Sequence, residues 1–285
     1  MKKSLTGSSV FNSARDQNMM VINCSVSAAR HLYKSYKKNQ DEGFFEPSST
    51  VVDTIQQRQP LINKNSGMQW VIHAIKLGRS TCLIAMEVNT RWTHVIHKVS
   101  KGNMDGFIQR LNERMVNGIE WLGKDYQLFK IDQMEKSISR YFRMNKEIRF
   151  YQQTDASVMA HISQVAAFYS QVWQDVGDFP DDEETALEFD LRLNEQWRCR
   201  KGEKYNLRAD EKMLSLWCKT YMQQNEQWIT DMLEKIRSQT QTALQEKLQT
   251  LAELREELFP SAQHDKGSST SSDNIFSLSK YREKK

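Results

Sequence analysis

The alternation of hydrophobic and polar residues predicts several strands in the first third of the chain. Four β-prone runs lie at residues 19–25, 68–77, 80–88 and 90–99. Gly78-Arg79 and Asn89-Thr90 separate the last three runs closely enough for hairpins. The pattern therefore predicts an antiparallel β-meander, with residues 40–66 forming a long surface loop before it.

Helical spacing dominates after residue 102, with Phe107, Leu111 and Met115 on one face. Helices are predicted at 25–40, 103–122, 132–146 and 154–173, and another follows the acidic turn at 178–190. Ser25 or Ser27 is the expected cap of the first helix, and Thr154 or Asp155 that of the fourth. The fourth is apolar on nearly every side and is expected to be buried, and residues 147–153 read as a further strand.

Residues 225–258 contain no Gly or Pro and predict one long amphipathic helix. Its apolar stripe is the expected partner-binding surface, and it comprises Ile229, Leu233, Ile236, Leu244, Leu248, Leu251, Leu254 and Leu258. Gln and Glu dominate the remaining face, which suits solvent. Because leucines at such spacing usually pack on another helix, we expect a coiled coil formed with a protein partner or as a homo-oligomer.

These elements predict an α+β fold, an antiparallel β-meander covered by helices, with a long C-terminal amphipathic helix. We expect four segments: a disordered arm at 1–18, the α+β domain at 19–217, the long helix at 218–259 and a disordered tail at 260–285. Met19 or Met20 is an alternative translation start, since the periodic pattern begins there.

Composition narrows the class of protein only slightly. The net charge is +4, which does not by itself require nucleic acid or an acidic membrane. No apolar run follows the two lysines at the start, and none is long enough to span a membrane, so a cytoplasmic location without membrane association is expected. The four cysteines, Cys24, Cys82, Cys199 and Cys218, lack metal-ligand spacing and read as reduced, structural thiols.

The order of these runs resembles a small, uncharacterised bacterial family, a domain of unknown function. The residues "MVINCS" match an I-I-N-C-T strand, and "STCLIAMEV" matches an R-x-K-C-L-I-F strand. The segment "QQTDASVMAHISQVAAFY" matches a helix opening of the N-R-S-V-L-G-S-M-N-D type, and Leu193-Asn194 with Tyr205 match the family's closing residues. The resemblance covers about residues 19–217 and implies a fold but no activity.

The chain departs from this family at the helix opening. Asp155-Ala156-Ser157 replaces Asn-Arg-Ser, and the residues 160–163 replace Gly-Ser-Met-Asn. No site built on those polar residues is therefore carried over to this chain.

His94 and His97 are the first candidates for chemistry. In a strand, residues three apart point to opposite faces, so the two imidazoles cannot hold one zinc ion. Trp92 and Ile96 should share the face of His94. We expect no metal and no cofactor, and the chain has no Walker, dinucleotide or G-x-S-x-G motif.

A basic stripe lies within the predicted helix at 132–146 and the strand after it. Its candidate nucleic-acid-binding residues are Lys136, Arg140, Tyr141, Arg143, Lys146 and Arg149. Cations at this spacing can contact phosphates, and Tyr141 or Phe142 could stack on a base. A solvated helix face over a buried Phe142 would have the same letters. The acids of 178–190 are expected to cap a helix, with Asp181 or Asp182 as the cap.

The sequence is compatible with three functions. The first is a non-enzymatic protein-interaction module that self-associates through the long helix. The second is a nucleic-acid-binding accessory protein of a mobile element. The third is a toxin or enzyme whose site is assembled from scattered residues such as His73, Arg91, Asp155 and His161. No catalytic residue is assigned.

Overall fold

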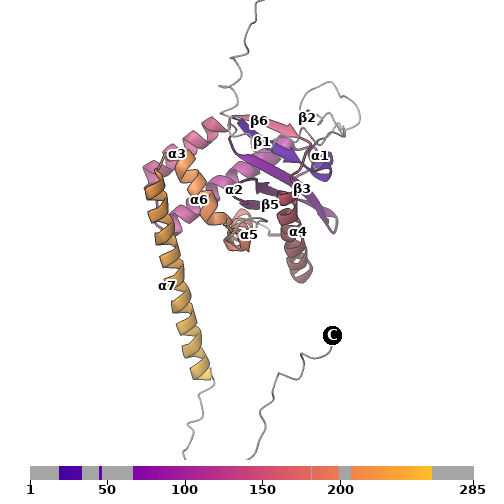
Figure 1. Cartoon of the computed structure of the whole chain (residues 1–285). Helices are drawn as coiled ribbons and strands as arrows, with labels where there is room; N and C mark the ends of the chain where they lie inside the picture. Colours follow the sequence, from indigo (N-terminus) through magenta and orange to yellow (C-terminus); the bar gives the residue numbers. More distant parts are fainter. Residues whose placement is uncertain (1–18, 34–44, 47–66, 181, 199–206, 259–285) are drawn as a thin grey trace, which may run out of the picture. The chain divides into compact units, whose positions relative to one another are not determined.

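A computed structural model describes residues 19–33, 45–46, 67–180, 182–198 and 207–258. Its centre is a six-stranded sheet in the order β2-β6-β1-β3-β4-β5 (Figure 1). The strands are β1 (Met19–Cys24), β2 (Phe45–Glu46), β3 (Gln69–Leu77), β4 (Ser80–Glu87), β5 (Thr93–Ile96) and β6 (Glu147–Tyr151). A small second sheet pairs β7 (Trp197–Arg198) with β8 (Leu207–Arg208).

The predicted meander is present as β3, β4 and β5, which pair antiparallel in chain order. A two-residue turn joins β3 to β4, and Gly78 occupies its left-handed position with φ of 58°. The prediction of a purely antiparallel sheet is wrong, because β1 pairs in parallel with both β3 and β6, and β2 pairs in parallel with β6. Side-chain alternation is the same in both kinds of strand, so it does not reveal the neighbour.

Seven helices lie within the described ranges. They are α1 (Val26–Leu32), α2 (Met104–Asp125), α3 (Ile131–Met144), α4 (Ala156–Val176), α5 (Glu183–Glu195), α6 (Ala209–Thr220) and α7 (Glu226–Leu258). The predicted caps Ser25, Asp155 and Asp182 each accept a backbone N–H three residues later. None of these helices has both the length and the apolar character that crossing a bilayer requires.

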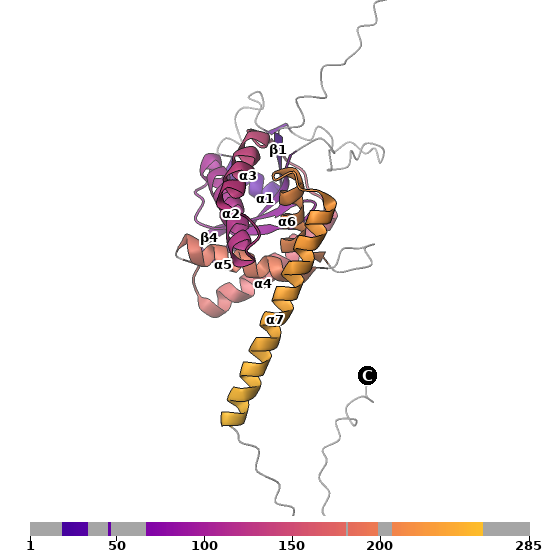
Figure 2. The same ribbon diagram turned by 90° about the vertical axis from the view of Figure 1, so that its left-hand side faces the viewer.

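The larger core lies on the sheet face that carries Met20, Ile22 and Trp70. α1, α2, α3 and α6 cover this face, together with the first turns of α7 (Figure 2). Phe107 and Leu111 of α2 are fully buried, as their spacing predicted. α6, which the sequence pattern did not single out, adds Met213, Leu214 and Trp217 to the same core.

The opposite sheet face is covered mainly by α4, whose Val158, Ile162 and Val165 pack on β3 and β4. The expectation that α4 is buried all round is wrong. Phe168 is 42% exposed and Val176 is 70% exposed, so α4 is a surface helix with one buried face. The prediction failed because apolar residues also occur on the outer face of α4. Hydrophobicity alone does not distinguish a buried helix from a half-buried one.

The chain divides into two compact units, residues 1–236 and 237–285. α7 begins in the first unit, where Ile229, Met232 and Ile236 are buried in the core, and its last turns belong to the second. The predicted boundary after residue 217 falls within α6. The arm at 1–18, the tail at 260–285 and most of the loop at 40–66 lie outside the described residues, so these three predictions remain untested.

Candidate functional site

A cleft of about 440 Å³ lies where β1 and β6 end. Its wall is formed by two stretches that leave these strands, Cys24–Ser27 and Gln152–Thr154, together with His73 of β3 and Met159 of α4. Ligand sites in soluble proteins are commonly clefts of this size with a few converging polar groups. The cleft therefore qualifies as a binding site on size and on polarity.

His73 is the hydrogen-bonding centre of this cleft. Its Nδ1 lies 3.0 Å from Ser25 Oγ and 3.4 Å from Ser27 Oγ. Ser27 also donates to the carbonyl oxygen of Ala74 at 3.0 Å, which continues the β1–β3 pairing beyond the end of β1. Partial burial lowers the pKa of His73, which favours the neutral form of its ring.

Asn23 of β1 lies beside this cleft and is fully buried. Its Oδ1 accepts a hydrogen bond of 2.6 Å from Nε2 of Gln153, which lines the cleft. Its Nδ2 has no hydrogen-bond partner. A buried amide donor without a partner costs free energy, so Nδ2 of Asn23 destabilises the fold unless another group accepts its hydrogen bond.

A buried charged network lies at the opposite edge of the sheet, under α5. The indole N–H of Trp92 donates to Nε2 of His94 at 2.9 Å, and Nδ1 of His94 donates to Asp190 Oδ2 at 2.9 Å. Arg114 donates to the same carboxylate oxygen at 2.9 Å and to Glu183 at 2.9 Å. His94 and Asp190 are fully buried and Arg114 is 4% exposed, so a substrate cannot reach these three side chains, and their hydrogen bonds hold α5 to the sheet.

His97 does not belong to that network. Its Nε2 donates to the carbonyl oxygen of Pro180 at 2.8 Å, and its ring stacks on Phe179. His94 instead stacks on Trp70, which lies in the other core. The two histidines therefore lie on opposite sides of the sheet, as the strand geometry predicted.

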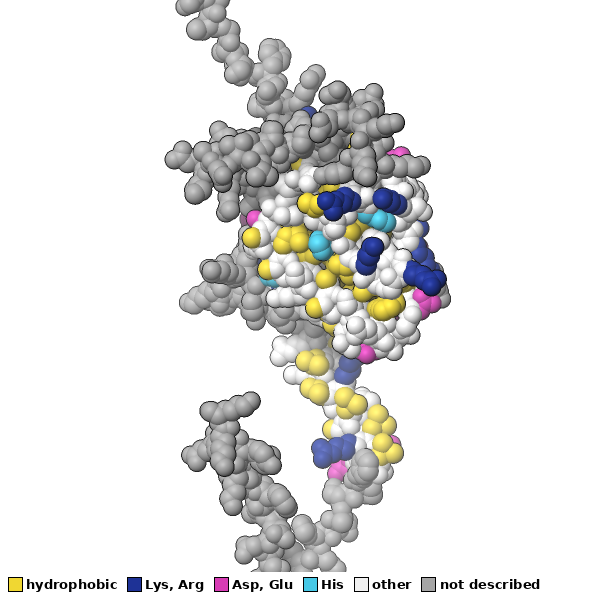
Figure 3. All heavy atoms as spheres, turned by 90° about the vertical axis from the view of Figure 1, so that its right-hand side faces the viewer, with side chains coloured by type: hydrophobic (Ala, Val, Ile, Leu, Met, Phe, Trp, Pro, Cys, Tyr) yellow, Lys and Arg dark blue, Asp and Glu magenta, His cyan; other side chains and the backbone are white. Residues whose placement is uncertain are grey.

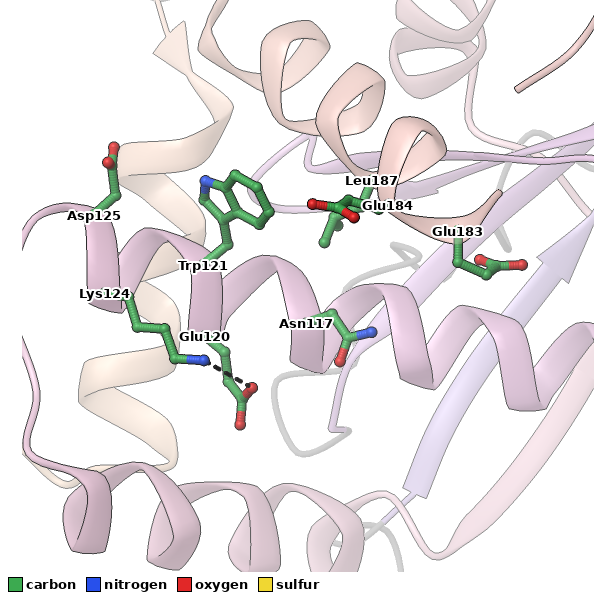
Figure 4. A pocket seen from close by; sticks show the side chains of 8 residues that line it. All are labelled: Asn117, Glu120, Trp121, Lys124, Asp125, Glu183, Glu184 and Leu187. Carbon is green, nitrogen blue, oxygen red and sulfur yellow. Dashed lines mark ion pairs between the residues drawn. The ribbon is translucent and has the colours of Figure 1, made fainter. Parts of the chain in front are cut away.

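A second cleft, of about 670 Å³, lies between α2 and the start of α5 (Figure 4). The indole of Trp121 stands in it and is 40% exposed. The carboxylates of Glu120 and Glu183 at its wall already have partners, since Lys124 lies 4.0 Å from Glu120 and Arg114 lies 2.9 Å from Glu183. An exposed indole beside carboxylates can contact a cation, and no further observation identifies a ligand there.

The basic stripe is only partly available for nucleic acid. Tyr141 is fully buried and packs against Trp217 and Tyr221, so it cannot stack on a base. Arg140 donates to the carbonyl oxygen of Tyr221 at 2.6 Å. Tyr141 directly follows Arg140 in the sequence, but it lies on the buried face of α3 with Met134 and Ser137.

The other members of that stripe are exposed. These are Lys136, Arg143, Lys146 and Arg149. Lys136 forms an ion pair of 3.4 Å with Asp132, one turn earlier. Phe142 is 49% exposed, so of the two aromatic residues that could stack on a base it is the accessible one, and the alternative in which Phe142 is buried is wrong.

The predicted partner-binding leucines divide into two groups. Ile229 and Ile236 are buried in the protein's own core and Leu233 packs at its edge, so these three are taken up by the first unit. The five leucines of the second unit, Leu244, Leu248, Leu251, Leu254 and Leu258, are between 47% and 71% exposed. Figure 3 shows the row of hydrophobic side chains along this part of α7.

The buried thiols Cys24, Cys82 and Cys218 are free, and burial raises the pKa of each to about 12. Such thiols are protonated and poor nucleophiles at neutral pH. Cys199 and Tyr205 lie outside the described residues.

The scattered residues of the enzyme hypothesis have separate surroundings. Asp155 caps α4, and Arg91 donates to Ser157 Oγ at 3.1 Å beneath the start of that helix. His161 is buried on α4. Of the four residues, only His73 lines either of the two clefts described above.

The protein thus has a mixed sheet that is flanked on both faces by helices. A family model, Domain of unknown function (DUF6933), matches residues 44–211, and the chain belongs to this family. The resemblance seen in the sequence is thereby confirmed at the level of family. The match does not include β1 or Ser25 and Ser27. A search of curated proteins gave no match.

Asn194 and Asp190 of α5 hydrogen-bond to the backbone of β5. Nδ2 of Asn194 donates to the carbonyl oxygen of Thr93, and the backbone N–H of Thr93 donates to Asn194 Oδ1, both at 2.8 Å. Asp190 Oδ1 accepts the N–H of Val95 at 3.0 Å. Because β5 is the edge strand, α5 side chains thereby satisfy backbone groups that would otherwise pair with another chain.

Proposed function

We propose that the protein is a non-enzymatic interaction module that associates with a second copy of itself through the end of α7. The observation that carries this proposal is the set of five exposed leucines at 244, 248, 251, 254 and 258. Isolated apolar side chains on a surface are ordinary, but a continuous row along a helix is typical of an interface. Covering each leucine would contribute about 1 kcal/mol.

The spacing of these leucines fits a short coiled-coil seam. Leu244, Leu248, Leu251 and Leu258 occupy four of five successive core positions in a heptad pattern, and Arg255 occupies the remaining one. In a parallel pair, Arg255 would face its own copy within the seam, which is unfavourable. An antiparallel pair instead places Arg255 beside Leu244 of the other copy, where its aliphatic stem can pack.

Charge also favours pairing between identical copies in antiparallel orientation. Residues 237–258 carry three basic and four acidic side chains, so two copies repel each other little. Lys247 lies in the middle of this segment, whereas Glu253, Glu256 and Glu257 lie toward its end. In the register that places Arg255 beside Leu244, antiparallel packing brings Lys247 of one helix next to Glu253 of the other.

The test measures the mass of the full chain by light scattering coupled to size-exclusion chromatography, over a series of concentrations. The expected result is a dimer that dissociates on dilution, because the seam is short. The double variant Leu248→Glu, Leu251→Glu should be a monomer throughout. The matched control Gln239→Glu, Gln249→Glu adds the same charge at exposed positions away from the seam and should remain dimeric.

A full chain that stays monomeric at every concentration would refute self-association. A dimer that persists in the leucine double variant would show that another surface forms it, which also refutes the proposal.

A further inference from the structure

The cleft at the ends of β1 and β6 lies at a special point of the sheet. The two strands are adjacent and parallel, and each continues directly into a helix at its carboxyl end. α1, which follows β1, packs in the core on one face of the sheet, whereas α4, which follows β6, packs in the core on the other face. Where neighbouring parallel strands send their helices to opposite faces, a crevice opens outside their carboxyl ends, and ligands of open α/β sheets bind there.

The residues of the cleft come from both sides of this crevice. Ser25 and Ser27 follow β1, and Gln152, Gln153 and Thr154 follow β6. His73 extends from β3 on the face that α4 covers, since the neighbouring Val71 packs in that core. This position is determined by the topology alone and does not depend on α7.

We propose that this cleft binds an uncharged small molecule whose ring carries neighbouring hydroxyl groups, the chemistry shared by free sugars and nucleosides. Among the described residues that line the cleft, none is acidic or basic apart from His73. A charged ligand would have to give up water without gaining a counter-charge, which is costly. Neighbouring hydroxyl groups each donate and accept, and they match the mixed donors and acceptors of serine, threonine, glutamine and neutral histidine.

Two further observations fit this ligand. Asn23 lies on the same sheet face as His73, and its Nδ2 donor is buried without a partner next to Gln153. A hydroxyl oxygen of the ligand, reached as Gln153 moves, would satisfy that donor. Val26 and Met159 supply an apolar surface on which a sugar or base ring can lie.

The experiment is saturation-transfer difference NMR on the full chain with D-glucose, D-ribose and adenosine, each tested separately. Adenosine 5′-monophosphate serves as the charged counterpart. Transfer to the ring protons of at least one neutral compound is expected, with weaker transfer to the monophosphate. Transfer to adenosine alone identifies nucleosides as the source of the chemistry, and transfer to the sugars identifies free carbohydrate.

The site is assigned with variants. His73→Phe keeps the ring but removes its hydrogen bonds and should weaken binding about tenfold. Thr154→Trp, at an exposed position on the rim, should fill the cleft and abolish the signal even if His73→Phe folds poorly. Trp121→Ala changes only the other cleft and should bind like the unmodified chain.

The absence of transfer to all three neutral compounds would overturn the proposal. Transfer that survives Thr154→Trp would overturn it as well, because binding would then occur elsewhere. Both results are independent of the oligomeric state, so they separate this inference from the self-association of α7.

Discussion

Asn194 replaces a neighbouring strand at one residue of the β5 edge. Its amide group presents one acceptor and one donor in the same spacing as a peptide unit, and Thr93 uses both. Arg198 adds a hydrogen bond of 3.0 Å to the Thr93 hydroxyl. All of these groups are buried, so the loss of any partner leaves an unsatisfied polar atom.

Replacing Asn194 with alanine should therefore destabilise the protein by about 3 kcal/mol, since two buried backbone groups lose their partners. Urea denaturation followed by tryptophan fluorescence measures this change. Asn117→Ala, which removes an exposed asparagine from α2, is the control and should change the free energy of unfolding by less than about 0.5 kcal/mol. Equal effects in the two variants would contradict this account of the edge.

His97 makes the stability depend on pH. Burial is the main cause that lowers the pKa of its ring, and the nearby charges of Arg114 and Lys98 lower it further, while the hydrogen bond to Pro180 opposes them. The folded protein therefore binds this proton less tightly than the unfolded chain. The corresponding stability is complete above the unfolded value of about 6.5 and is lost as the pH falls from there through the folded value.

His97→Gln should reduce this loss, because glutamine can still donate to the Pro180 carbonyl and does not titrate. The free energy of unfolding is measured for both proteins from about pH 8 to about pH 5. The variant should lose less stability over this range than the unmodified protein. Identical slopes would show that His97 is not the group responsible.

At the scale of elements, α7 combines two environments in one helix. Ile229, Met232 and Ile236 are buried in the first unit, and the leucines beyond residue 243 are exposed. In the sequence this division shows only as a break in the apolar stripe, because residues 237–243 contain no isoleucine or leucine. The helix itself was predictable from the absence of Gly and Pro. The residue at which its burial ends depends on which side chains of the first unit pack against it, and the local pattern does not show these.

Two alanine substitutions test this division of α7 into a buried part and an exposed part. Ile236→Ala should cost about 3 kcal/mol through the cavity it leaves, whereas Leu251→Ala should cost less than about 0.5 kcal/mol. All seven tryptophans lie between residues 70 and 228, so their fluorescence reports the unfolding of the first unit alone. A large effect of Leu251→Ala on that transition would contradict the exposure of this leucine.

Other elements show why some predictions succeeded. The β3–β4 hairpin was predictable because Gly78 supplies the left-handed conformation that a two-residue turn requires. α5 was predictable because Asp182 is a strong cap within an acidic run. α4 was placed correctly but judged too buried, since Phe168 and Val176 are apolar residues that face outward.

At the scale of the whole molecule, the parallel half of the sheet was not predictable from local pattern. β1 and β6 are far apart in the chain, and nothing in either run specifies that they are neighbours. The cleft was missed for the same reason, because Ser25 and His73 come together through the β1–β3 pairing and Gln153 joins them through the β1–β6 pairing. The only sequence signal was a group of small hydroxyl residues directly after a strand.

The central place of β1 has a consequence for how the chain is made. During translation this strand leaves the ribosome first among those of the sheet, yet its partner β6 spans residues 147–151. Until that segment emerges, one edge of this largely apolar strand has no partner, and the nascent polypeptide exposes unpaired backbone groups and apolar side chains. Chaperones that recognise extended hydrophobic segments should therefore engage this nascent chain early and release it only once β6 has been synthesised.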